Sequence, residues 1–150
     1  MMIRFEETVT VPQFFDRIKQ RYGDAEKFRA YVKRNPRDVR VKQDLEDFEY
    51  YTEHPELVYE KIQRAVSLIP VGPEALTLFT EQRLKIIDTL KHKQFGSIRQ
   101  LADYLRRDVR NVHDDLSLFE SLGFLEFDRG PRNTRIPRLL ADSILLTPAK

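Results

Sequence analysis

The sequence predicts a mainly α fold: a winged helix-turn-helix domain with a two-stranded wing, preceded by an N-terminal helical region. Three observations support this prediction. Apolar residues recur at helical spacing along most of the chain, two short capped helices follow Ser97, and an arginine-rich turn lies between two short strand-like segments near residue 130. The Pro-Val-Gly-Pro segment at 70–73 is the candidate boundary between these two regions. We therefore expect residues 1–73 to form the helical region and residues 74–150 the winged helix-turn-helix domain.

Composition excludes several classes of protein. The 150 residues contain no cysteine, which excludes disulfides and thiolate metal sites. Arg4, Glu6 and Glu7 interrupt the N-terminus, so no apolar run there reaches the length of a signal peptide core or a membrane span. We expect a cytoplasmic protein with no membrane partner.

Charge is unevenly distributed along the chain. Residues 1–79 hold 13 lysines and arginines against 14 acidic residues, whereas residues 80–138 hold 12 against 9. The surplus of positive charge in residues 80–138 comes from arginines that cluster in two places. Because charged surfaces are most often simply solvated, this asymmetry indicates a nucleic-acid partner only in combination with a motif.

The N-terminal region is expected to be helical after one short strand. The first eleven residues alternate loosely between apolar and polar, which favours a strand. Four helices are expected to begin near Pro12, Asp24, Asp38 and Pro55. The fourth is expected from an apolar stripe that runs up to Pro70: Val58, Ile62, Ala65, Val66 and Ile69. Short helices with apolar stripes need a partner surface, which either an intrachain bundle or a homodimer would supply.

A helix-turn-helix is predicted from Thr80 onward. Thr80 is placed to cap a first helix that ends near Gly96, and Ser97 with Gln100 forms a capping box for a second helix. The small side chain of Ala102 permits close crossing of the second and third helices. The turn is Arg106-Arg107 rather than the commoner glycine, and a positive φ at Arg106 would cost on the order of 1 kcal/mol.

The third helix, residues 109–122, is the predicted recognition helix. It begins after the N-cap Asp108, and its buried stripe is expected to include Val112, Leu116 and Phe119. Its N-terminal half, the part that reaches base edges in such domains, leaves a polar set off the stripe: Arg110, Asn111, His113, Asp114 and Ser117. Arginine pairs bidentately with guanine and asparagine with adenine. The alternative is that these are ordinary exposed helix residues.

A basic hairpin, the predicted wing, follows at residues 124–138. Residues 124–127 and 134–136 are expected to be its strands and residues 129–133 its turn. Guanidinium groups on this hairpin suit phosphate or minor-groove contact. With the turn and the third helix, the predicted DNA-binding residues are Arg106, Arg107, Arg110, Asn111, His113, Ser117, Arg129, Arg132 and Arg135.

These features resemble a known class. Residues 76–138 resemble the winged-helix domains of small prokaryotic transcriptional regulators of the MarR and ArsR class, and of a group of small DNA-binding proteins of archaea and bacteria. The resemblance rests on the run RDVRNVHDDL at 107–116 and on LGFL at 122–125. It implies sequence-specific binding of double-stranded DNA by the third helix and the wing, commonly as a homodimer. Asp114 and Asp115 depart from it, since a basic residue there would help phosphate contact.

Other functions find less support in the sequence. Glycine-rich phosphate loops, nucleophile elbows and zinc-protease motifs are absent, so no enzyme activity and no cofactor are expected. Glu49, Glu53 and His54 fit a solvated face better than a metal site.

Two alternative functions stay open. One is an effector pocket lined by the aromatic residues Phe14, Phe28, Tyr31 and Tyr51. The other is a protein-interaction module on a winged-helix scaffold, favoured by the acidic run 44–60 and by the Asp114-Asp115 pair.

Overall fold

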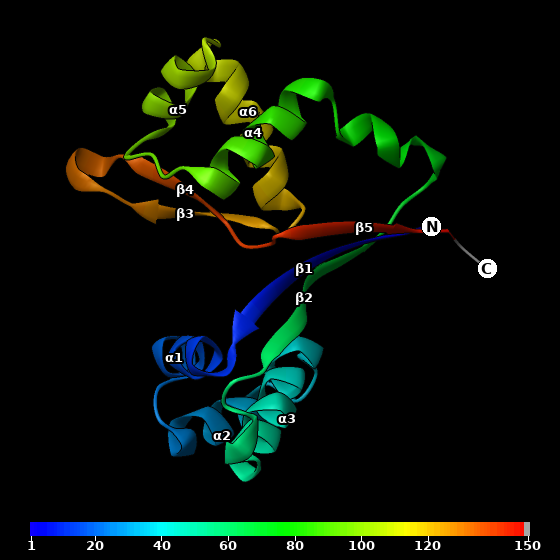
Figure 1. The fold of residues 1–150 in the computed structure, drawn as a ribbon, viewed down its shortest axis with the longest axis vertical. Helices are drawn as coiled ribbons and strands as arrows, with labels where there is room; N and C mark the ends of the chain where they lie inside the picture. Colours follow the sequence, from blue (N-terminus) through cyan, green and yellow to red (C-terminus); the bar gives the residue numbers. More distant parts are fainter. Residues whose placement is uncertain (149–150) are drawn as a thin grey trace. The chain divides into compact units, whose positions relative to one another are not determined.

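The computed structural model describes residues 1–148 and has a mixed α/β fold (Figure 1). Its elements in chain order are β1 (Met2–Thr10), α1 (Val11–Tyr22), α2 (Ala25–Arg34), α3 (Val39–Glu53), β2 (Lys61–Pro70), α4 (Glu81–His92), α5 (Ile98–Leu105), α6 (Val109–Ser121), β3 (Leu125–Arg129), β4 (Arg135–Leu139) and β5 (Ser143–Thr147). Short 3-10 turns lie at Pro55–Leu57, Pro73–Leu78 and Pro131–Asn133. The prediction of a mainly α fold is wrong, because a three-stranded sheet accompanies the two-stranded hairpin.

The three-stranded sheet joins segments from the start, middle and end of the chain. Its strand order is β2-β1-β5, and β1 and β5 pair antiparallel, with Ile3 facing Leu146 and Phe5 facing Ile144. The expected short strand in the first eleven residues is thereby confirmed. The second sheet is the antiparallel hairpin β3–β4, in which Leu125 faces Leu139.

Strand β2 lies where a fourth helix was expected, and that prediction is wrong. Ile62 and Val66 are both buried, and their spacing of four residues places them on one face of either a helix or a strand. The β-branched side chains favour the strand, where they pack on a pleated surface. Pro70 is the last residue of this strand. Strand β5 was not expected at all.

The chain forms two compact units. One comprises residues 1–7 together with the chain from Arg64 onward, and the other comprises residues 8–63. Strands β1 and β2 therefore each contribute residues to both units. Among residues 1–148 no helix is both long enough and apolar enough to cross a membrane.

The core of the first unit is built on stacked aromatic rings. The ring of Phe5 stacks on Phe124 at a centroid distance of 4.2 Å, and Phe119 packs against Phe124 at 4.9 Å. Helices α4, α5 and α6 each contribute fully buried aliphatic side chains to this core: Ile86, Leu101, Val112 and Leu116. Strand β1 thus supplies part of the surface on which the helices pack.

The core of the second unit is also aromatic. Phe14 and Phe28 are fully buried, and the ring of Tyr22 stacks on Phe28 at 4.3 Å. The hydroxyl of Tyr22 donates to Oδ2 of the buried Asp44 at 2.8 Å. Burial, followed by this hydrogen bond to Asp44, raises the pKa of Tyr22 to about 12. Phe14 and Phe28 are therefore core residues, and they do not supply exposed walls for the effector pocket that the sequence left open as an alternative.

Candidate nucleic-acid interface

Helix α5 begins at a side-chain cap, as expected. The amide of Gln100 donates to the Ser97 hydroxyl at 3.1 Å. The Gln100 side chain accepts from the amide of Gly96 at 2.8 Å, one residue before the Ser97 amide that a strict capping box would use. The start of α5 is therefore fixed by hydrogen bonds on both sides of Ser97.

The turn between α5 and α6 holds Arg106 in the left-handed region, with φ 55° and ψ 45°. The amide of Arg106 donates to the Asp103 carbonyl at 3.2 Å, and that of Arg107 to the Ala102 carbonyl at 3.0 Å. These bonds close the end of α5, and the small buried Ala102 lies beneath them. The side chain of Arg106 is exposed.

Helix α6 begins at Asp108, whose carboxylate accepts from the amides of Arg110 at 2.8 Å and Asn111 at 3.3 Å. Arg110 and Asn111 are exposed in the first turn of the helix, next to this cap. Farther along, Asp114 is exposed, and His113 and Ser117 are half-buried. The structure therefore brings together, on the outer side of one helix, the residues that the sequence assigned to base contacts.

Asp115 and Arg107 lie inside the unit. Asp115 is only 8% exposed, and its two carboxylate oxygens accept from Arg107 Nη2 at 2.8 Å and from Arg83 Nε at 3.0 Å. Arg83 also donates to the Leu78 carbonyl at 3.1 Å. We call Arg83, Asp115 and Arg107 the buried ion cluster. It ties α4 to α6 and to the turn before α6.

This cluster changes two interpretations of the sequence. Arg107 was expected to contact DNA, but its guanidinium is directed at Asp115, and its buried Nη1 has no hydrogen-bond partner within residues 1–148. The sequence placed Asp115 on or beside the reading surface of α6, but it lies three residues after Val112 and four before Phe119, within the buried stripe. Arg83 was not singled out from the sequence. The acidic residue within an apolar stripe was the signal that a buried cation lies opposite it.

The β3–β4 hairpin has a strained turn. Arg132 and Asn133 have φ values of 57° and 60°. Arg129 and Arg132 are exposed and form no ion pair with the described part of the chain. By contrast, Arg135 lies 4.0 Å from the centroid of the Phe127 ring and 3.8 Å from the Glu120 carboxylate of α6. The hairpin is therefore packed beside the end of α6.

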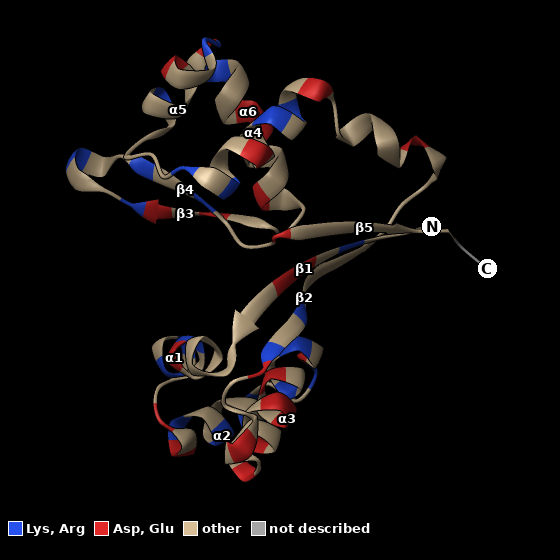
Figure 2. Cartoon of the chain, in the orientation of Figure 1, with Lys and Arg blue, Asp and Glu red and all other residues tan. Residues whose placement is uncertain are grey.

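Exposed arginines gather at two places of the first unit. Figure 2 shows basic segments at the α5–α6 connection and at the end of the hairpin. The arginines there that have no ion-pair partner in residues 1–148 are Arg106, Arg110, Arg129 and Arg132. Arg138, in contrast, pairs with Glu126 and with Asp128. Within residues 1–148 no group of three or more potential metal ligands comes together.

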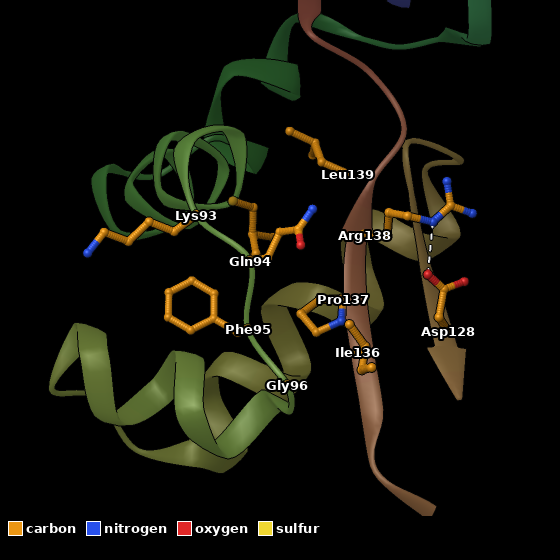
Figure 3. Close-up of a pocket in the computed structure, with 10 residues that line it drawn as sticks. Lys93, Gln94, Phe95, Gly96, Asp128, Ile136, Pro137, Arg138 and Leu139 are labelled. Atoms are coloured by element: carbon orange, nitrogen blue, oxygen red, sulfur yellow. Dashed lines mark hydrogen bonds and ion pairs between the residues drawn. The ribbon is translucent and has the colours of Figure 1, made fainter. Parts of the chain in front are cut away.

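A cavity of about 520 Å³ lies between the end of α4 and strand β4 (Figure 3). Phe95, Ile136 and Pro137 supply apolar walls, and the Arg138 guanidinium at its rim is held by Asp128. The Lys93 ammonium lies 4.5 Å from the centroid of the Tyr104 ring. Both cations beside this cavity thus already interact with side chains of the protein. The residues that line the cavity do not indicate a particular ligand.

In comparisons with known proteins, part of this unit is similar to a protein family. A family model described as HVO_A0114 matches residues 78–146, which span α4 to β5 almost to its end. No curated protein and no solved structure matches the chain. The chain is thus similar to this family over the helices and the hairpin that form the candidate interface.

Proposed function

We propose that this chain is a transcriptional regulator that binds double-stranded DNA through α6 and the β3–β4 hairpin. The observation that carries the proposal is the placement of four exposed arginines without ion-pair partners in residues 1–148. Arg106 and Arg110 flank the start of α6, and Arg129 and Arg132 lie at the hairpin turn. A helix with exposed arginines just before it and in its first turn, and with a basic hairpin beside it, matches the major groove and the adjacent backbone or minor groove of a duplex.

The residues have different roles in this proposal. Arg110 and Asn111 are exposed in the first turn of α6, where side chains reach base edges, so they supply direct readout. Arg106, Arg129 and Arg132 lie on turns and supply phosphate or minor-groove contacts. His113 and Ser117 flank the reading surface. Arg107 is left out, because it belongs to the buried ion cluster.

Asp114 shapes the expected affinity. Its carboxylate is exposed on α6 beside the proposed reading surface, where it repels phosphates and accepts only from donors such as the cytosine amino group. Non-specific binding depends almost entirely on neutralising phosphates. We therefore expect selective binding of modest affinity.

The test is selection of bound sequences from a random duplex pool, followed by titration of the selected duplex at two salt concentrations. Arg110→Ala is expected to lose roughly 1 to 3 kcal/mol of binding free energy and to relax the preference at one base position. Arg37→Ala, which removes an exposed arginine in the second unit, is the matched control and should bind as the unchanged protein does. Absence of duplex binding by the folded protein at low salt would refute the proposal.

A protein-interaction module without DNA binding is less well supported. The Asp114-Asp115 pair was part of its basis, and Asp115 is neutralised inside the unit by Arg83 and Arg107. Only Asp114 of the pair is exposed to a partner.

A further inference from the structure

Strand β5 is an exposed edge of the three-stranded sheet. It pairs with β1 on one side, and in the strand order β2-β1-β5 it has no neighbour on the other side within residues 1–148. All five of its residues are exposed, including the consecutive aliphatic side chains Ile144, Leu145 and Leu146. An edge strand presents unpaired backbone donors and acceptors, so its natural partner is another strand.

The two edges of this sheet differ in charge. Proteins protect exposed edges with charged residues or proline, and β2 carries Lys61 and Arg64 and ends at Pro70. Strand β5, with the sequence Ser-Ile-Leu-Leu-Thr, has no charged residue and no proline between Ser143 and Thr147. The β5 edge therefore lacks the features that prevent pairing with another chain.

We propose that β5 pairs antiparallel with β5 of a second copy of this chain, around a two-fold axis at Leu145. In this register Leu145 faces Leu145 of the partner subunit, Ile144 faces Leu146 and Ser143 faces Thr147. Each side chain meets one of similar polarity, and no like charges oppose each other, so the strand is complementary to itself. The two three-stranded sheets become one continuous sheet across the dimer.

The size of this edge sets the strength of the dimer. A standard stable interface buries about 800 Å² of surface on each partner. A five-residue strand with three half-exposed aliphatic side chains buries less than that. The dimer is therefore reversible and depends on protein concentration. The sequence had left open either dimerisation or intrachain packing of the N-terminal helices, whereas this proposal places the dimer contact at β5. The proposed dimer does not depend on DNA binding. Its tests use the protein without DNA, so their failure and the failure of the proposed function are distinguishable.

The first test is sedimentation velocity of the full chain over a range of concentrations. The unchanged protein is expected to shift from monomer to dimer as concentration rises. Leu145→Glu places two carboxylates against each other at the axis, while within its own chain residue 145 faces Arg4 across the β1–β5 pair. This variant should keep its fold, checked by thermal unfolding, and remain monomeric.

Leu68→Glu is the matched control, since Leu68 is an exposed leucine on the edge strand β2 and should leave the dimer intact. A monomer at every concentration for the unchanged protein overturns the proposal, as does a dimer that survives Leu145→Glu or is lost in Leu68→Glu alone.

The absence of cysteine allows a second, covalent test. Antiparallel residues that face each other have Cα atoms about 4.5 to 5.5 Å apart, within the range that a disulfide spans. Under mild oxidation Leu145→Cys should yield a disulfide-linked dimer, whereas Leu68→Cys should not. Cross-linking by the second variant and not by the first would overturn the assignment of the edge.

Discussion

Removing the carboxylate of Asp115 is expected to destabilise the first unit strongly. The side chain of Asp115 is 12% exposed, and those of Arg107 and Arg83 are 18% and 27% exposed, so all three groups lie mostly out of water. In Asp115→Asn the two guanidinium groups stay in place without a counter-charge. Loss of one partner of a buried ion pair costs about 3 to 5 kcal/mol of unfolding free energy. Because Arg83 retains partial contact with solvent, we expect about 3 kcal/mol.

Chemical denaturation measured by far-UV circular dichroism tests this value, and Asp114→Asn is the matched control. Asp114 is the neighbouring residue on α6, its side chain is 71% exposed, and it faces solvent. We expect its replacement to change the unfolding free energy by less than about 0.5 kcal/mol and to strengthen duplex binding. An Asp115→Asn protein as stable as the Asp114→Asn protein would show that the buried ion cluster does not hold α4 against α6.

Three further predictions concern single residues. Arg106→Gly should relieve the left-handed strain and raise the unfolding free energy by up to about 1 kcal/mol, whereas Arg106→Ala keeps the β-carbon and should not raise it. Both variants should weaken duplex binding. Equal unfolding free energies for the two variants would refute the strain at Arg106. Tyr22 has its pKa raised from 10.0 to about 12, so its protonated form contributes stability that is fully present below pH 10 and is lost as pH rises towards 12. Denaturation of the unchanged protein and Tyr22→Phe at both ends of this window should show a steeper loss for the unchanged protein, and parallel losses would contradict the shift. Arg132→Ala should weaken binding to all duplexes alike and reduce the salt dependence by about 0.9 in the log-log slope, whereas a sequence-dependent loss would place Arg132 at a base edge instead.

Helix starts in this chain could be predicted because their causes are local. Asp24, Asp38, Thr80, Ser97 and Asp108 each accept a hydrogen bond from an amide two or three residues later, as their types and positions indicate. A cap needs only its own helix, so the sequence around it contains the necessary information. The same holds for the positive φ at Arg106, where a helix ends without a glycine.

The three-stranded sheet could not be predicted in the same way. Ile62 and Val66 fit one face of a helix as well as one face of a strand, and the choice depends on β1, more than fifty residues earlier in the chain. Strand β5 is five residues long and exposed throughout, so it has no alternation of buried and polar positions to reveal it. Its existence depends on pairing with Met2–Glu6 at the other end of the chain.

The candidate site shows the same division between local and distant causes. The exposure of Arg110 and Asn111 follows from the buried stripe of their own helix. Arg106 and Arg107 are adjacent and chemically identical, yet only Arg107 meets a buried carboxylate. Helical spacing alone would have placed Asp115 in the stripe, but the position of Arg83 on α4 depends on the packing of two helices.

The contrast between these two arginines connects the stability of the turn to the proposed function. The left-handed conformation at Arg106 ends α5, and the next side chain, Arg107, is directed inward to Asp115. Glycine at position 106 would form this turn without strain, but it would carry no charge. Arginine there costs on the order of 1 kcal/mol of backbone strain and places a free guanidinium immediately before α6. Arg107 and Arg83 both donate to Asp115, which ties the first turns of α6 to α4. In the proposed function, a turn that holds Arg106 and Arg110 in one arrangement would lower the entropy lost on binding a duplex.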